Sequence, residues 1–289
     1  MEWVNAVIQG ILLGGQYALL ACGLSLIFGV MRIVNLAHGV LAVAAAYAAY
    51  WVLQQVDIPP FAALVVVIPV FALVGYVLQR GLFNFALAHG ELSPLMVSFG
   101  VAVIAANLLQ EQFSANSRSI QIGSLGTDSV ALGGGLAVGT FSVLTFAVGV
   151  AVIGAVQVFL ARTRTGRAMR ATSDDPDAAT LMGIDNRHVY ALATAIAIAT
   201  VALAGVFLGM STQFSPTYGD MVLIFAFEAV IIGGLGSLWG TLVGGLVLGV
   251  AQTIGAQVDP AYGILAGHLV FLAVLLLRPS GLMPKVAIA

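Results

Sequence analysis

The chain has 289 residues, of which 61% are hydrophobic and only 8% are charged, and its mean hydropathy is +1.08. Soluble domains carry about 25% charged residues, so this composition excludes a soluble globular protein. The formal net charge of −2 indicates no particular partner, and the positions of the charges along the chain are more informative.

Eight apolar blocks follow one another, and most are long enough to cross a hydrocarbon core of about 30 Å. In chain order they are Val4–Val30, Ile33–Leu53, Pro60–Leu78, Leu92–Leu109, Leu136–Leu160, Val189–Met210, Met221–Ala251 and Ala261–Leu277. They predict an all-α fold, a polytopic bundle of transmembrane helices, with residues 1–289 forming a single domain. The longest interval on the side opposite the basic loop described below, Gln110–Gly135, is expected to form a short lid or a surface hairpin.

The seventh block is too long for one ordinary span, and a glycine cluster interrupts it. Gly233, Gly234 and Gly236 precede Ser237 and predict a helix break, which a membrane protein tolerates where neighbours satisfy the freed backbone groups. Gly236, Gly240 and Gly244 then recur every four residues. This spacing lets two helix backbones approach closely, so we expect these glycines to pack helices together.

One long polar stretch, Ala161–His188, holds half of the ten basic residues of the chain. Short basic loops stay in the cytoplasm, which places this one inside. If the seventh block crosses twice, nine of the ten basic residues lie inside and only Arg118 lies outside. We therefore expect about eight to nine spans, an external N-terminus and an internal C-terminus.

The same polar stretch carries the signals of a short helix. Asp174 or Asp175 can cap it, Pro176 suits its first position, Asp177 favours the positive end of the helix dipole, and Gly183 can end it. Its apolar face would consist of Ala178, Leu181 and Met182. Such a helix can dock in a groove of a motor protein, although a plain solvated connector would carry the same signals.

A few polar residues lie within the apolar blocks. Glu228 costs about 2.5–3.5 kcal/mol to insert, so it is expected to line a substrate path, to bond to a neighbouring helix or to be protonated. Asn35 and His38 suit either hydrogen-bonded packing or a pathway. Asn107, with Gln110 close to it, suits either the mouth of a pathway or a bond to an adjacent helix.

Catalytic and cofactor signals are weak. The four histidines are too scattered for a metal site, and Cys22 is the single cysteine, which excludes an internal disulfide. The only lysine is Lys285, and no GxxxxGK[ST] phosphate loop occurs. We therefore expect no enzyme activity, no cofactor and no metal, and any ATP-driven transport requires an ATPase on another chain.

Several motifs, in order along the chain, resemble one family. They are Gly15–Leu19 (GQYAL), Gly23–Arg32 (GLSLIFGVMR), Ile33–Gly39 (IVNLAHG), Thr165–Ala171 (TGRAMRA), Ala178-Ala179 followed by Leu181–Ile184 (LMGI), Ala204–Val206 (AGV), Gly233–Ser237 (GGLGS) and Arg278–Leu282 (RPSGL). Together they resemble the LivH-type inner-membrane permeases of branched-chain amino acid ABC importers.

The resemblance implies the membrane half of an importer in the bacterial inner membrane. Its partners would be a second permease, favoured as a paralogue, two cytoplasmic ATPases and a periplasmic binding protein. Residues 161–188 would then be the coupling loop, with the ATPase contacts at Arg167, Arg170, Asp174, Asp175, Asp177, Ala178, Leu181 and Gly183.

The substrate stays open on the sequence alone. Branched-chain amino acids are favoured by the resemblance, and urea, short amides and aromatic or other organic acids are alternatives. Glu228 departs from the family pattern. An ion-coupled secondary transporter that uses Glu228 is the alternative function, although such carriers often have paired broken helices and the sequence shows one clear break.

Overall fold

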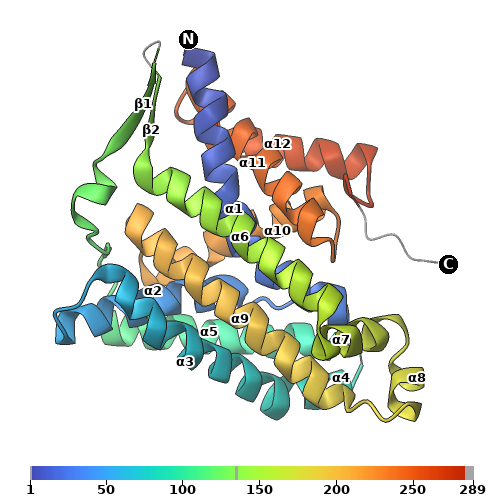
Figure 1. Cartoon of the computed structure of the whole chain (residues 1–289). Helices are drawn as coiled ribbons and strands as arrows, with labels where there is room; N and C mark the ends of the chain where they lie inside the picture. The colour runs from blue at the N-terminus through green and yellow to red at the C-terminus, as the bar shows by residue number, and fades with distance from the viewer. Residues whose placement is uncertain (1, 91, 134–135, 284–289) are drawn as a thin grey trace.

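The computed structural model describes residues 2–90, 92–133 and 136–283, and these residues form a helical bundle (Figure 1). Its helices are α1 (Glu2–Met31), α2 (His38–Gln55), α3 (Ala63–Leu78), α4 (Asn84–Leu87), α5 (Ser93–Phe113), α6 (Thr140–Arg162), α7 (Arg164–Asp174), α8 (Pro176–Leu181), α9 (Asn186–Ser211), α10 (Gly219–Gly233), α11 (Leu238–Val258) and α12 (Tyr262–Leu277). Short helical turns are η1 (Pro60–Ala62), η2 (Gln79–Phe83), η3 (Gly123–Gly126) and η4 (Pro216–Tyr218), and the strands are β1 (Ser129–Gly133) and β2 (Leu136–Gly139). The predicted all-α class is confirmed, with one small hairpin added.

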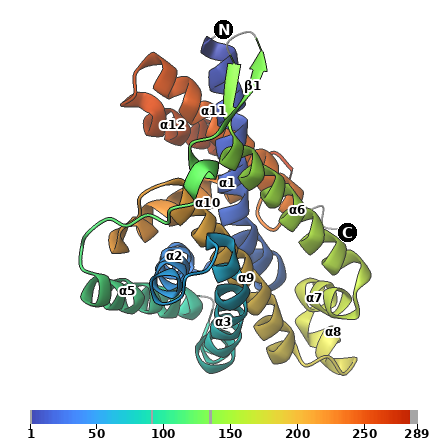
Figure 2. The same ribbon diagram turned by 60° about the vertical axis from the view of Figure 1, so that its left-hand side comes forward.

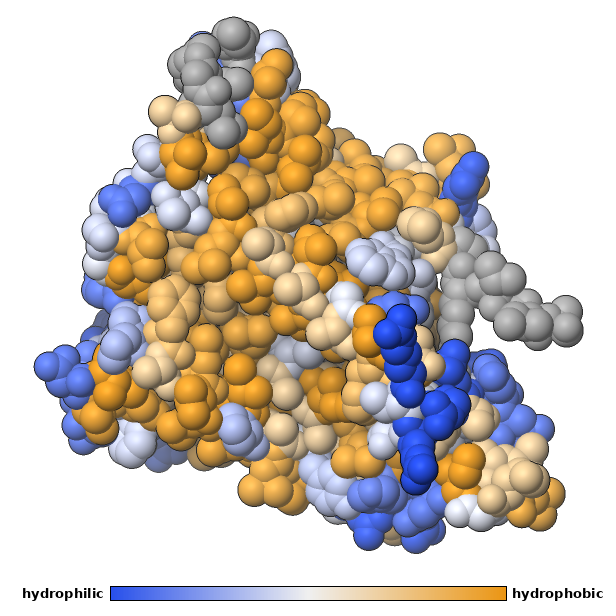
Figure 3. Space-filling view, in the orientation of Figure 1, coloured by the Kyte–Doolittle hydropathy of each residue, from blue (hydrophilic) through white to orange (hydrophobic). Residues whose placement is uncertain are grey.

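In the described ranges, seven segments are long and apolar enough to cross a membrane: Glu2–Met31, Pro60–Leu87, Ser93–Phe113, Thr140–Arg162, Asn186–Ser211, Pro216–Gly233 and Leu238–Val258. α12 is apolar but shorter, and α2 is not among the seven. The face shown in Figure 3 is largely apolar, with hydrophilic residues at its margins. An apolar belt of this kind suits a surface that contacts lipid.

α1 lies at the centre of the bundle and is packed by α6, α9, α10 and α11. Its residues from Tyr17 to Ile27 are buried. A Cβ on Gly14 would lie 2.6 Å from the backbone oxygen of Gly245, so α1 and α11 touch backbone to backbone. Small residues produce this close packing, which replaces the hydrophobic driving force that lipid does not supply.

α2 is the second enclosed helix, and it lies among α3, α5, α9 and α10 (Figure 2). It begins at His38 and not at the start of the predicted block Ile33–Leu53. Arg32 has a φ of 56°, which ends α1 in the left-handed region, and residues 33–37 run back without helical structure. Asn35 stabilises this turn because its Oδ1 accepts a hydrogen bond from the Ala37 backbone at 3.0 Å.

A similar interruption follows α9. Residues 212–215 lack helical structure, the backbone of Phe214 pairs with that of Arg118, and α10 begins at Gly219. A Cβ on Gly219 would lie 2.8 Å from the Cα of Val40, so the first turns of α10 and α2 meet inside the bundle. The chain thus has two similar stretches, α1–α2 and α9–α10. In each, a long helix is followed by a non-helical segment and then by a second helix, and the two second helices meet at their first turns. The sequence analysis found only one break and missed this pair.

The chain also breaks where the glycine cluster predicts. α10 ends at Gly233 and α11 begins at Leu238, with φ values of 111° at Gly234 and 78° at Gly236, which favour glycine. The freed carbonyls have partners, because the backbones of Leu282 and Met283 donate to the Ile232 and Gly233 oxygens at 2.8 Å. The segment after α12 therefore closes the break.

The interval expected to form a lid or a hairpin contains β1, which pairs antiparallel with β2 just beyond the end of the interval. Residues 134–135 of this interval lie outside the described residues. The predicted block Leu136–Leu160 starts too early, because its first four residues form β2 and α6 begins only at Thr140. The hairpin lies next to the start of α1, where Gln9 Nε2 donates to the Ala137 oxygen at 3.1 Å.

Gly244 tests the packing of α10 against α11. A Cβ there would overlap the backbone of Ala229 and Gly233, so Gly244→Ala should destabilise the protein by about 1–3 kcal/mol through overpacking. Gly154→Ala in α6 is the matched control, because nothing lies within 4 Å of its added methyl group. It should be neutral or stabilise by up to about 1 kcal/mol. Thermal unfolding of the two variants in detergent, monitored by size-exclusion chromatography, gives their melting temperatures. Equal melting temperatures would contradict the packing argument.

Candidate coupling surface and buried polar groups

α7 is anchored to the membrane helices. Thr163 caps it, since the Thr163 Oγ1 accepts from the Gly166 backbone at 2.9 Å. A Cβ on Gly166 would lie 2.5 Å from the Cα of Leu160, so α7 packs directly on the end of α6. Met169 is fully buried, and the Ser173 hydroxyl donates to the Gly29 oxygen at the end of α1 at 2.7 Å.

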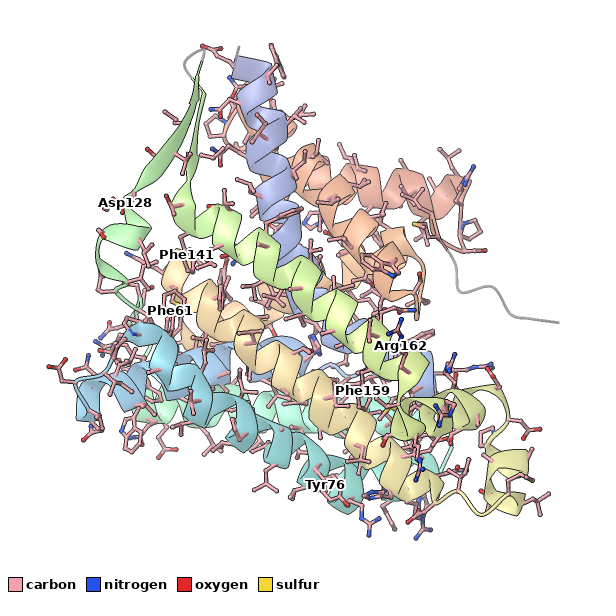
Figure 4. All side chains as sticks on the ribbon, in the orientation of Figure 1. Phe61, Tyr76, Asp128, Phe141, Phe159 and Arg162 are labelled. Carbon is pink, nitrogen blue, oxygen red and sulfur yellow. The ribbon has the colours of Figure 1, made fainter. Side chains whose placement is uncertain are left out.

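Two of the expected ATPase-contact residues bond to the end of α6. Arg167 Nη1 donates to the Arg162 oxygen at 3.2 Å, and Arg170 Nη2 donates to the Ala161 oxygen at 3.3 Å. The last carbonyls of a helix have no partner inside that helix, and cations there also suit its dipole. Figure 4 shows Phe159 and Arg162 at this end of α6, next to α7.

α8 is a short helix with a clear cap. Asp175 accepts from the backbones of Asp177 and Ala178 at 3.0 and 2.9 Å, while Asp174 is the last residue of α7. Gly183 has a φ of 83° just beyond the helix. Asn186 braces α8 from α9, because its Nδ2 donates to the Pro176 oxygen at 2.7 Å.

The outer side of α8 is apolar and exposed. Leu181 is 88% exposed and Met182 is 82% exposed, whereas Ala179 on the inner side is buried. Ala178 is also exposed. A braced helix that presents two large apolar side chains to solvent has the form of a docking knob, and exposed apolar groups of this kind mark contact sites when they cluster.

Glu228 has a partner that the sequence spacing did not reveal. Its Oε1 pairs directly with Nδ1 of His268 on α12, and its side chain is only 6% exposed against 42% for His268. Phe225 stacks on the His268 ring. The second carboxylate oxygen of Glu228 is buried and has no hydrogen-bond partner among the described residues.

A second buried polar pair lies between α1 and α11. The Tyr17 hydroxyl donates to Gln252 Oε1 at 2.5 Å, and the side-chain nitrogen of Gln252 is buried without a partner among the described residues. The sequence analysis proposed neither residue as a site. Tyr17 lies in the quoted GQYAL motif, but nothing in the sequence connects it to a residue 235 positions away.

The remaining expected pathway residues lie in two different environments. Asn35 and His38 are buried, and His38 Nε2 donates to the Leu20 oxygen at 2.8 Å, so His38 joins the start of α2 to α1. Asn107 lies on the exposed side of α5 and its Nδ2 donates to the Val103 oxygen at 2.7 Å. Gln110 is also exposed. The structure does not bring Asn107 together with Asn35 or His38.

Within the described residues, no group of three or more His, Cys, Asp or Glu side chains has a metal-site arrangement. The short helices α7 and α8, the long apolar helices and the buried polar pairs are together typical of one class, the integral membrane transport proteins.

Comparison with known proteins gives the family. The family description "Branched-chain amino acid transport system / permease component" matches residues 6–277, so the chain belongs to this family and is the membrane-spanning permease subunit of an ABC importer. BraD, a high-affinity branched-chain amino acid permease protein of Pseudomonas aeruginosa, is 31% identical over 98% of this chain and 96% of its own length. LivH of Escherichia coli K12 is 27% identical over 99% of this chain and 96% of its own length. The fructose import permease protein FrcC of Rhizobium meliloti is 31% identical over 75% of this chain and 62% of its own length. These relatives are transport permeases and not enzymes.

The Glu228–His268 pair predicts an asymmetric response to substitution. His268→Ala leaves a buried carboxylate without its partner and should cost about 1–3 kcal/mol of stability. Glu228→Gln keeps a hydrogen-bonding group beside His268 and should cost less. Thermal unfolding of the two variants and of the double variant gives their coupling energy.

A coupling energy near zero would contradict the pairing. If Glu228→Gln instead abolished uptake without changing the melting temperature, Glu228 would belong to the pathway.

Proposed function

We propose that residues 1–289 form one permease domain that pairs with a paralogous permease in the bacterial inner membrane and imports branched-chain amino acids or a related small polar organic solute. A periplasmic binding protein delivers the solute, and two cytoplasmic ATPases drive alternating access. The family supports this proposal, as do the names of BraD and LivH. An ion-coupled carrier that uses Glu228 has no support from these relatives.

The observation that supports ATPase coupling most strongly is the exposure of Leu181, the last residue of α8, and of Met182 directly after it, on a helix that neighbouring residues cap and brace. α8 is capped by Asp175 and braced by Asn186, and α7 is bonded to α1 through Ser173. A push on α8 is therefore passed to the ends of α1 and α6 and not absorbed by a loose loop. The polar residues of 161–188, among them Arg167, Arg170, Asp174 and Asp177, would surround this apolar contact.

We further propose nine crossings, made of the seven long segments together with α2 and α12, an external N-terminus and an internal C-terminus. Contacts between element ends support this orientation. Arg80 forms an ion pair with Asp185 at 3.9 Å, next to the start of α9, whereas Arg118 pairs with Phe214 beyond the opposite end of α9. Arg32 follows the end of α1 that bonds to α7. Lys285 lies outside the described residues.

We propose that the substrate path runs between the two permeases, on a face that includes α5. Of the residues of α5 only Pro94 and Ser98 are buried, although it is long enough to span. Its polar Asn107 is an expensive residue to expose to lipid, which favours a partner subunit or an aqueous path there. A path role for Asn35, His38 and Glu228 is a weaker proposal, because all three are buried within the chain.

The docking knob gives a direct test. In cells that make the complete importer, Leu181→Asp combined with Met182→Asp should release the ATPase from the purified permease and abolish ATP-dependent uptake, since a charge in an apolar contact is left unpaired. Leu125→Asp in η3 makes the same chemical change in the interval that lies on the other side. The Leu125→Asp protein should retain the ATPase. If the Leu181→Asp, Met182→Asp protein retained it as well, that result would contradict the docking site.

The orientation is testable with single cysteines, since the native Cys22 is fully buried and should not react. Ser124→Cys in η3 should be labelled in intact spheroplasts by a membrane-impermeant maleimide. Asp174→Cys at the end of α7 should be labelled only after the membrane is permeabilised. The reverse pattern would invert the proposed topology.

A further inference from the structure

A cavity of about 190 Å³ lies where α1, α6, α7 and the start of α11 meet. Its lining combines apolar side chains with the polar groups of Ser25, Gln157, Arg170, Ser173 and Ser237, and Trp239 is also part of it. None of the described residues that line it is acidic. By volume it holds about six water molecules, which is enough for a lipid headgroup but not for a whole lipid.

The residues that line the cavity include a buried polar group, the hydroxyl of Ser25. Ser25 is fully buried, and its hydroxyl has no hydrogen-bond partner among the described residues. A buried hydroxyl without a partner costs about 1–3 kcal/mol, so the position favours a ligand that supplies an acceptor or a donor. Burial alone does not explain why the Ser25 hydroxyl lacks a partner, because the neighbouring Ser173 and Ser237 hydroxyls both bond to backbone groups.

The charge of the lining is positive. Arg170 uses one nitrogen to bond to the Ala161 oxygen, and a guanidinium has five N–H donors, so others remain for a ligand. Figure 4 shows Arg162 at the end of α6, next to α7, and Figure 3 shows a hydrophilic cluster beside the apolar face. An arginine binds a phosphate group with paired hydrogen bonds.

The position of the cavity in the membrane indicates which kind of phosphate-bearing molecule it binds. Its walls include the last turns of α1 and α6, which is the cytoplasmic leaflet in the proposed orientation, and Trp239 is 44% exposed. Tryptophan is enriched at membrane–water interfaces. Basic pockets between transmembrane helices on the cytoplasmic side bind anionic headgroups, and the anionic lipids lie in that leaflet.

We propose that this cavity is a binding site for the headgroup of one anionic phospholipid of the inner leaflet, held by Arg170 and Ser25, with an acyl chain leaving past Leu160 and Trp239. The ligand would touch α7 of the coupling loop and Gly236 of the glycine break at once. The site is thereby joined to both the proposed coupling surface and the helix break. The inference rests on the proposed orientation, which the cysteine labelling tests separately.

The test is native mass spectrometry of the complete importer in detergent, titrated with phosphatidylglycerol and, in parallel, with phosphatidylcholine of the same chains. The wild type should retain one phosphatidylglycerol more tightly than phosphatidylcholine. Arg170→Gln and Ser25→Leu should each weaken this binding by about tenfold or more, through a lost charge-assisted bond and a filled cavity respectively. Arg164→Gln removes the same charge from an exposed residue of the same loop outside the cavity, and it should bind as the wild type does.

The same spectra report subunit composition, so loss of the ATPase from Arg170→Gln is seen separately from loss of lipid. Ser25 lies outside the coupling loop and gives the second, independent variant. Unchanged phosphatidylglycerol binding in both variants, or equal retention of phosphatidylcholine by the wild type, would overturn the site. Inorganic phosphate, added at millimolar concentration, should fail to displace the lipid, and displacement would assign the cavity to a free anion instead.

Discussion

Backbone groups freed where a helix of a membrane protein ends inside the packed bundle need partners from the protein itself, and this constraint acts on the permease at three interruptions among the described residues. The turn after α1 is held by Asn35 and by the Ser98 hydroxyl, which accepts from the Leu36 backbone at 3.1 Å. The return after α9 pairs with Arg118, and the glycine break pairs with the segment after α12. Each interruption is therefore bonded to a residue or segment far away in the sequence, so it is complete only once those distant parts have packed together.

Bonds between such distant segments form only where helices approach closely, and glycine allows this approach because it has no side chain. Gly14 and Gly245 join α1 to α11, Gly233 and Gly244 join α10 to α11, and Gly219 lies against Val40. With a methyl group at any of these positions, the helices would stand farther apart. The polar pairs Tyr17–Gln252 and Glu228–His268, which depend on α1, α10, α11 and α12 lying close together, would then separate as well.

Much of the fold was predictable because transmembrane helices are local features of hydropathy. The apolar blocks predicted the long helices. The glycine cluster predicted the break, because positive φ values favour glycine. The Asp175–Pro176 cap and Gly183 gave α8, since caps and stops are read from adjacent residues. The return before α2 was missed because residues 33–37 are hidden within an apolar block. The interval before α10 was expected between the blocks that end at Met210 and begin at Met221, but nothing in the sequence related it to the return before α2. His268 was missed as the partner of Glu228, because a pair 40 residues apart depends on which helices pack together, and sequence spacing alone does not determine that.

The bonds from Leu282 and Met283 to Ile232 and Gly233 also impose an order on biogenesis. The two donors are synthesised about fifty residues after the two carbonyls, once α11 and α12 have been made. Until then the Ile232 and Gly233 carbonyls lack the partners that they have in the folded protein. The last stage of folding is then the return of a short segment to a turn already in place, so premature release from the ribosome would leave an inserted helical hairpin that cannot close.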